Sequence, residues 1–255
     1  FDMFLQKRSC CGNTRKFYFK ALRAILNRAN AEGVGSVATY PFGRGGFEVS
    51  KLEEATAKRY LPAAELSKLK SATANNPQCE YARKLFLFSY YCYGISFIDM
   101  AMLTPAHTKQ MEDGDYIVYK RQKIKRQKGV KPISIKITPA IRQLIESLQA
   151  ASPTVDDFLL PVVTRSGYTG ERLYMHIRTR YSKYQKYLRL LAEELGIDFH
   201  LTSYVSRHTA AMTLQRNHIP REVISQMLGH ADLETTNVYL DSFDNGVINE
   251  AAKVL

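Results

Sequence analysis

Long apolar runs and metal-type cysteine spacing are absent from this sequence. No apolar run approaches the roughly 18 residues of a membrane span, so we expect a soluble protein without a membrane anchor. The four cysteines, at positions 10, 11, 79 and 92, form neither a CxxC pair nor a Cys/His metal set, and no secretory signal pattern is present. We therefore expect a reducing cytoplasm and no bound metal. The chain also lacks an initiator Met, so we expect a fragment whose N-terminal part is missing.

Acidic residues are scarce relative to basic ones. The chain carries 36 Lys and Arg against 24 Asp and Glu, a net charge of +12. Residues 119–131 read YKRQKIKRQKGVK, with seven basic residues and no acid. Such a surface repels itself unless a polyanion neutralises it, which favours nucleic acid as the partner, with anionic lipid as the alternative.

Two segments divide the chain. Residues 14–31, TRKFYFKALRAILNRANA, place Phe17, Leu22 and Ile25 at helical spacing and predict an amphipathic helix. The Gly-rich stretch EGVGSVATYPFGRGGF that follows reads as a linker. We therefore expect one domain over 1–48 and a larger one over 49–255.

The larger domain is predicted to be mainly α with a small antiparallel sheet, an α+β class. DYIVYKRQKI and KPISIKI alternate with period two around a loop that holds Gly129, which predicts a β-hairpin with a basic tip. Apolar patterns predict helices over about 62–69, 78–103 (one or two buried helices), 139–151, 175–195, and most of the rest, with breaks at Pro220 and Gly229.

Three features of the last third have a distinctive mutual spacing. Taken singly, Arg207 fits a solvated helix residue, Gly229-His230 a helix end, and Tyr239 a half-buried amphipathic residue. The run RHTAAMTL begins at Arg207, an LGH begins twenty-one residues after Arg207, and a TTNVY ends nine residues after His230. Taken together, these three motifs resemble the C-terminal boxes of the tyrosine recombinase (phage-integrase-type) family. The resemblance is to the branch found on bacterial mobile elements, strongest over 200–243 and looser back to residue 78.

The resemblance implies a recombinase catalytic domain preceded by part of a helical, SAM-like core-binding domain. It implies site-specific cleavage and rejoining of DNA through a 3′-phosphotyrosyl intermediate, with Tyr239 as the nucleophile. Arg207 would clamp the scissile phosphate, because a guanidinium matches phosphate geometry with two parallel hydrogen bonds. His230 would bind the same phosphate and assist proton movement. No metal, nucleotide or other cofactor is implied.

The basic hairpin also fits the resemblance. In this family a hairpin lysine protonates the leaving 5′ oxygen, which points to Lys123. Neighbouring and downstream basic residues are candidate DNA contacts: Lys120, Lys125, Arg126, Lys128, Arg178, Arg180 and His208.

Two positions depart from the family pattern. The second box usually begins with His or Lys, where this chain has Tyr204, an uncharged hydrogen-bond donor. The first box usually supplies an arginine, where the alignment gives either Ser96 or Tyr93. We hypothesise that Arg121 replaces it from the hairpin, on the same strand face as Lys123, since side chains of a strand repeat with period two.

The resemblance further implies partners: double-stranded DNA, a tetramer of this chain on two sites, and accessory DNA-bending or directionality factors, all in the bacterial cytoplasm. The segment after Tyr239, NGVINEAAKVL, is amphipathic and either docks on a neighbouring subunit or packs on its own domain. Two alternatives stay open. One is a catalytically impaired DNA-binding accessory or architectural relative, and the other is a topoisomerase of similar chemistry.

Overall fold

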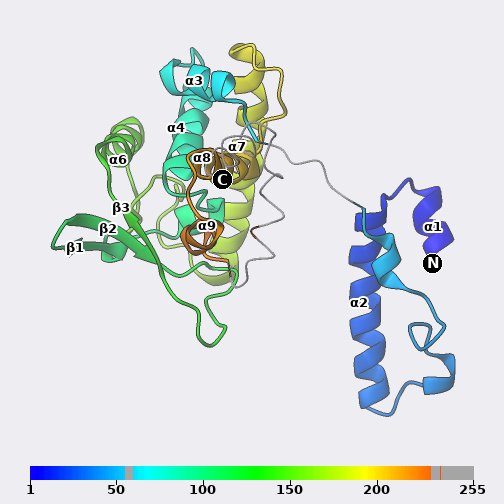
Figure 1. The fold of residues 1–255 in the computed structure, drawn as a ribbon. Coiled ribbons are helices and arrows are strands. Elements are labelled where there is room, and N and C mark those ends of the chain that lie inside the picture. Colours follow the sequence, from blue (N-terminus) through cyan, green and yellow to red (C-terminus); the bar gives the residue numbers. More distant parts are fainter. Residues whose placement is uncertain (55–59, 231–235, 237–255) are drawn as a thin grey trace, which may run out of the picture. The chain divides into compact units, whose positions relative to one another are not determined.

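The structure, a computed structural model, describes residues 1–54, 60–230 and 236. The chain divides into two units, Phe1–Ala57 and Lys58–Leu255, whose elements are labelled in Figure 1. The sequence placed the boundary at residue 48, at the end of a predicted linker. That Gly-rich stretch instead packs within the first unit, because Phe42 and Phe47 lie against Phe19, with the Phe19 and Phe47 rings stacked 4.2 Å apart.

The first unit contains helices α1 (Asp2–Lys7) and α2 (Gly12–Ala31) and two short 3₁₀ helices, Val37–Thr39 and Val49–Leu52. The helix predicted over 14–31 is confirmed, but its apolar face was predicted wrongly. Phe19 is buried, whereas Phe17 and Ile25 are exposed. The small core of this unit selects the face that meets Leu5 and Val49 rather than the face with the stronger apolar pattern.

The second unit is built around helix α4 (Pro77–Tyr91), which contacts α6, α7 and α8. The apolar stretch predicted to hold one or two buried helices forms two, α4 and α5, because the chain turns at Tyr93 and Gly94, both with positive φ. The remaining helices are α3 (Ala63–Ser71), α5 (Phe97–Ala101), α6 (Pro139–Ala151), α7 (Gly170–Glu194), α8 (Ser203–Arg216) and α9 (Arg221–Leu228).

Local sequence signals fix the ends of these helices. Asn76 caps α4 by accepting hydrogen bonds from the amides of Gln78 and Cys79, and Thr138 caps α6 in the same way. Helix α9 ends at Gly229, whose left-handed conformation (φ 64°, ψ 44°) suits a residue without Cβ. This cap turns the chain sharply just before His230.

The sheet has three antiparallel strands in the order β1 (Thr108–Met111), β2 (Gly114–Tyr119) and β3 (Ile133–Lys136). The predicted hairpin is confirmed as the β2–β3 pair, which starts at Tyr119 opposite Ile133. The strand is shorter than predicted, and residues 120–132 form a loop that extends away from the sheet (Figure 1). The expectation that Arg121 and Lys123 share a strand face is therefore wrong, because the chain forms a turn here in which the Ile124 amide donates to the Arg121 carbonyl at 3.1 Å.

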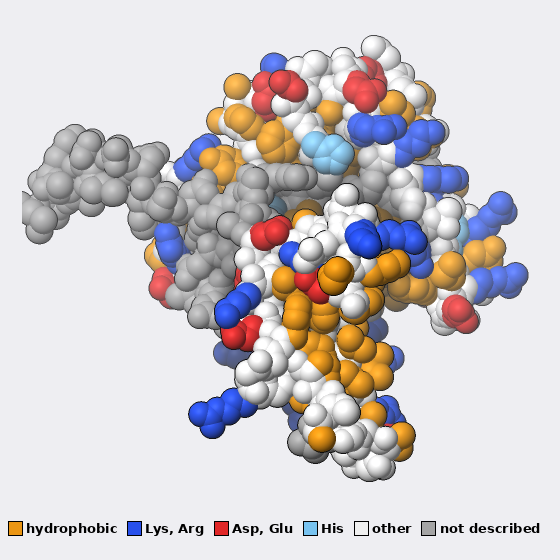
Figure 2. All heavy atoms as spheres, turned by 90° about the vertical axis from the view of Figure 1, so that its right-hand side faces the viewer, with side chains coloured by type: hydrophobic (Ala, Val, Ile, Leu, Met, Phe, Trp, Pro, Cys, Tyr) orange, Lys and Arg blue, Asp and Glu red, His pale blue; other side chains and the backbone are white. Residues whose placement is uncertain are grey.

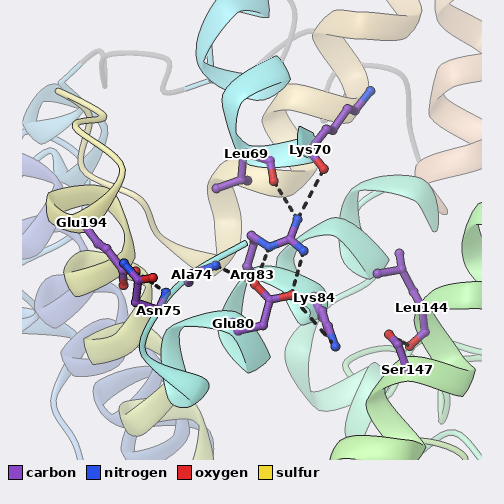
Figure 3. A network of polar contacts seen from close by, with 10 residues as sticks. All are labelled: Leu69, Lys70, Ala74, Asn75, Glu80, Arg83, Lys84, Leu144, Ser147 and Glu194. Atoms are coloured by element: carbon purple, nitrogen blue, oxygen red, sulfur yellow. Dashed lines mark hydrogen bonds and ion pairs between the residues drawn. The ribbon is translucent and has the colours of Figure 1, made fainter. Parts of the chain in front are cut away.

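The buried Arg83 of α4 joins this helix to the end of α3 and forms an ion pair with the half-buried Glu80 of its own helix. The Arg83 guanidinium donates to both Glu80 carboxylate oxygens at 2.7 Å and to the Leu69 and Lys70 carbonyls at the end of α3 (Figure 3). Burial alone raises the pKa of Glu80, but the hydrogen bonds from Arg83 and the Ala74 amide outweigh it and hold that pKa below its usual value. The pair satisfies carbonyls that a helix end leaves without partners.

Surface charge follows the composition. Lys and Arg side chains project from several parts of the face drawn in Figure 2. Among the residues that the structure describes, no helix has both the length and the apolar character that crossing a bilayer requires.

Candidate active site

Arg207 is the buried centre of the site. It lies on α8 with only 4% of its surface exposed. Its Nη1 donates to the Gly94 carbonyl at 3.0 Å, and its Nη2 donates to the Leu228 carbonyl at the end of α9. The same Nη2 lies 3.0 Å from Nε2 of His230. One guanidinium therefore joins the α4–α5 turn, α8 and the end of α9.

Gly94 lies in the turn between α4 and α5, directly against Arg207. Its φ is 73°, and a Cβ added there would lie well inside 3.0 Å of the Cα and Cβ of Arg207. The backbone of the α4–α5 turn thus passes directly against the backbone of α8. Only glycine permits this approach, which brings the Gly94 carbonyl within reach of the guanidinium.

His230 is held at both ring nitrogens. A guanidinium has no acceptor, so Nε2 must accept the hydrogen bond from Arg207. The ring proton then lies on Nδ1, which donates to the Thr236 hydroxyl at 2.7 Å. Thr236 is fully buried and was not singled out from the sequence, although it lies within the TTNVY motif. The contact fixes the tautomer and the direction of the ring.

Arg121 reaches the same place from the β2–β3 loop. Its Nη1 donates to the Gly229 carbonyl at 3.2 Å, next to the carbonyl that Arg207 holds. The following amide, that of Gln122, donates to the buried Asp99 carboxylate at 2.7 Å. The side chain of Arg121 and the backbone beside it are therefore both anchored.

The first-box positions have different surroundings. Ser96 caps α5 and donates to Asp99 at 2.6 Å. Arg121, Ser96, Tyr204 and Arg207 all line one cavity of about 380 Å³. Tyr93 is not part of that lining, and burial raises the pKa of its phenol.

A buried phenol lies near the two guanidiniums. Tyr119 ends β2, and burial raises its pKa strongly. Asp99 raises this pKa further, whereas Arg207 and Arg121 lower it. Tyr119 was not predicted from the sequence as part of this region.

The predicted DNA contacts fall into two groups. Within the β2–β3 loop the side chains are exposed and apart from the cavity: Lys120, Lys123, Lys125, Arg126 and Lys128. On the helices, Arg178 is exposed and lines the cavity, whereas Arg180 is half-buried and donates to the Val162 carbonyl at 3.1 Å. His208 is half-buried, with its ring edge-to-face with Tyr204 at 5.0 Å.

The predicted nucleophile, Tyr239, lies outside the described residues, as does the predicted amphipathic segment after it. The described residues bring together Arg207, His230 and Arg121, whereas Lys123, on the same β2–β3 loop as Arg121, is exposed and does not line the cavity. In the part of the chain that the structure describes, no group of three or more His, Cys, Asp or Glu residues is placed to hold a metal ion.

Comparisons with known proteins agree on one family. Residues 59–245 match the sequence model of the phage integrase family. A stretch of 54 residues is 41% identical to the tyrosine recombinase XerD of Halalkalibacterium halodurans, covering 21% of this chain and 18% of that relative. The matched part is thus less than a fifth of the relative's length.

Two solved structures have the same fold over nearly the whole chain. The site-specific recombinase XerH, in a post-cleavage complex with palindromic difH substrate, has a TM-score of 0.66 at 17% identity over 98% of this chain and 69% of that one. The Tn1549 transposon integrase, in complex with transposon right end DNA, has a TM-score of 0.67 at 13% identity over 98% of this chain and 82% of that one.

Proposed function

This chain belongs to the phage integrase family, and on that premise we propose that it is a site-specific DNA recombinase acting through a phosphotyrosyl intermediate. The observation that carries the proposal is the junction at the end of α9. There Arg207 and Arg121 hold the neighbouring carbonyls of Leu228 and Gly229, and His230 follows directly. Cationic donors fixed on one point are what a phosphate undergoing substitution requires.

In the proposed reaction, the phenol oxygen of Tyr239 attacks the scissile phosphorus. When DNA binds, Nη2 of Arg207 turns from Nε2 of His230 to the phosphate, so that Nε2 accepts the phenol proton and Arg207 donates to the non-bridging oxygens as negative charge develops on them. The bond between phosphorus and the 5′ oxygen breaks as the tyrosine–phosphorus bond forms, and Lys123 gives its proton to the leaving oxygen. A 5′ hydroxyl from a partner strand reverses these steps, so religation consumes no cofactor.

Arg121 supplies the second guanidinium in this proposal, in place of the arginine missing at Tyr93 or Ser96. Two observations support this role: Arg121 is hydrogen-bonded to the Gly229 carbonyl, and it lines the same cavity as Arg207. We expect Arg121→Ala to slow cleavage by about 10²–10³, the cost of losing one fixed donor to a developing oxyanion. Arg126→Ala, which removes an exposed charge of the same loop, is the matched control, and an equal loss in both variants would remove Arg121 from the active site.

Lys123 is exposed in the β2–β3 loop and must reach the leaving oxygen when DNA is bound. Its neighbours Lys120, Lys125, Arg126 and Lys128 bind the phosphate backbone of double-stranded DNA in this proposal. The first unit is proposed to be the C-terminal part of a helical core-binding domain. The active assembly is proposed to be a tetramer of this chain on two sites in the bacterial cytoplasm, with accessory DNA-bending or directionality factors.

A nicked suicide duplex with the element's own crossover site tests the reaction. We expect this chain, and not Tyr239→Phe, to form a protein–DNA band that resists denaturation. The covalent band requires the phenol, whereas binding to the duplex does not, so a gel-shift measurement on the Tyr239→Phe variant controls for folding. Tight binding by both proteins without any covalent band would contradict the proposal.

That outcome would favour the second candidate, a DNA-binding relative without catalysis. The observation behind it is the first box, where neither Tyr93 nor Ser96 carries a positive charge. The decisive comparison is the rate of band formation by the Arg121→Lys variant. A partial rate supports a cationic role for this position, and no band from any variant or from the unaltered chain supports the accessory function.

A further inference from the structure

Exposed aromatic rings of the second unit gather at one place. Among its described Phe and Tyr side chains, only Tyr174, Tyr181 and Tyr204 are exposed, at 59%, 38% and 53% of their surface. All three line the cavity of about 380 Å³ that also contains Arg207. Exposed aromatic rings cost hydrophobic free energy, so their concentration around one cavity marks a binding surface.

The cavity has a rigid apolar floor. Phe97 and Ile177 are buried, and the Phe97 ring stacks on Tyr184 with their centroids 5.1 Å apart. On the rim, Tyr181 lies 5.4 Å from Phe97, and its hydroxyl is 3.1 Å from the Ser203 hydroxyl. The walls are therefore in place before a ligand arrives, which lowers the entropic cost of binding.

The lining of this cavity is cationic. Arg121, Arg178 and Arg207 all contribute to its lining, whereas none of the lining residues is acidic. Its volume lies near the lower end of the roughly 300–1,000 Å³ typical of small-molecule sites, which suits one nucleotide and is too small for a base pair. Aromatic faces next to guanidiniums are the combination that binds a planar base attached to a phosphate.

We propose that this cavity binds a single unstacked nucleotide, with its base against Tyr174 and Tyr181 and its phosphate held by the guanidiniums of the lining. Two sources supply this chemistry: the nucleotide beside the scissile phosphate of the DNA, and a free mononucleotide. The first rests on the proposed recombinase function. There, taking one base out of the stack loosens the duplex at the point where strands are exchanged.

Tyr174 is the residue to change, because it is the most exposed of the three rings and its loss removes no core packing. Affinity for the crossover duplex is measured with Tyr174→Ala, with Tyr174→Phe as the ring-retaining control. Each is measured on the intact duplex and on a set of duplexes with one abasic nucleotide placed on either side of the scissile phosphate. A gel shift or fluorescence anisotropy supplies the dissociation constant.

We expect Tyr174→Ala to bind the intact duplex about 5- to 150-fold more weakly, the range for loss of one base-stacking contact. On the duplex that lacks the bound base, Tyr174→Ala and the unaltered chain should bind equally, and Tyr174→Phe should behave like the unaltered chain throughout. The same loss on every abasic duplex would overturn the DNA source.

Free deoxynucleoside monophosphates, titrated by calorimetry, test the second source. Millimolar or tighter binding that Tyr174→Ala abolishes, without any abasic coupling, assigns the cavity to a soluble nucleotide. If the abasic duplexes show no coupling and the mononucleotides do not bind, the proposal is overturned. The covalent band of Tyr239 is scored on the same samples, so a band with neither coupling nor mononucleotide binding defeats the cavity assignment alone, and coupling without a band defeats the recombinase function alone.

Discussion

Replacing Gly94 with alanine should damage the fold and the phosphate clamp together. Two costs add at this position. A non-glycine residue at φ 73° costs about 1–2 kcal/mol in the left-handed region. The new Cβ also meets the backbone of Arg207, and overpacking of this kind costs about 1–3 kcal/mol more. We therefore expect Gly94→Ala to lower the free energy of unfolding by about 2–5 kcal/mol.

The matched control is Gly196→Ala, at the end of α7. Its φ is 60°, and a Cβ there meets nothing within 4 Å, so only the conformational cost of about 1–2 kcal/mol applies. Urea unfolding followed by tyrosine fluorescence measures both variants, since the chain has 16 Tyr and no Trp. With a slope of about 2 kcal/mol per molar urea, an extra 2 kcal/mol moves the midpoint by about 1 M.

Equal midpoints for the two variants would refute the reasoning, because both positions have a positive φ and only a Cβ at Gly94 would clash with Arg207. A second readout separates stability from function. At low temperature and without urea, the folded Gly94→Ala variant should cleave the suicide duplex more slowly than the unaltered chain, because α8 must shift to accept the new methyl group. Gly196→Ala should cleave at the unaltered rate.

Three further perturbations probe other parts of the second unit. Glu80→Gln should lower the free energy of unfolding by about 1–2 kcal/mol at pH 7. The difference from the unaltered chain should shrink as the pH falls below about 4, because the Glu80 carboxylate, whose pKa is depressed in the native state, then becomes protonated. Replacing both Lys125 and Arg126 by Gln should make the slope of log affinity against log salt shallower by about 1.8. Thr236→Val should slow cleavage about fivefold by releasing the proton-bearing nitrogen of His230.

Each of these has a contrary outcome. Thermal unfolding across pH measures the loss of stability in Glu80→Gln. A loss that stays constant down to pH 3 would mean that the charge of Glu80 contributes nothing to stability. An unchanged salt slope in filter binding would remove the exposed β2–β3 loop from the DNA interface. Thr236→Ser retains the hydroxyl and should cleave normally, so a loss in that variant would point to packing rather than to the hydrogen bond.

The sequence predicted the helices of the second unit well because their caps and apolar periodicity are local. It failed where tertiary contacts decide. The hairpin pattern continued past Tyr119, but the Asp99 carboxylate binds the Gln122 amide and ends the strand before Arg121. The apolar face of α2 was chosen wrongly because Phe19, and not Phe17, meets the aromatic residues of the Gly-rich stretch.

In the candidate active site, too, local sequence patterns predicted some features and tertiary contacts decided the others. The spacing of the boxes predicted that Arg207 and His230 belong to one site, and the structure places Nη2 of Arg207 3.0 Å from Nε2 of His230, while their catalytic roles stay predictions. The role of Gly94 and the Thr236 hydrogen bond could not be predicted, since each depends on segments that meet only in the folded chain. Tyr239 as the nucleophile and Lys123 as the acid stay predictions.

The contact between Gly94 and Arg207 also sets an order of events during synthesis. The ribosome adds about 5–20 residues each second, so roughly ten seconds separate the appearance of Gly94 from that of Leu228 and His230. Until α8 is synthesised, the α4–α5 turn has neither the guanidinium that its carbonyl binds nor the α8 backbone that packs against it, and Arg207 then lacks Leu228 and His230 until the interval ends. A nascent chain therefore has no assembled clamp. A protein whose proposed reaction breaks DNA therefore acquires that capacity only after Leu228 and His230 have been synthesised and have met Arg207.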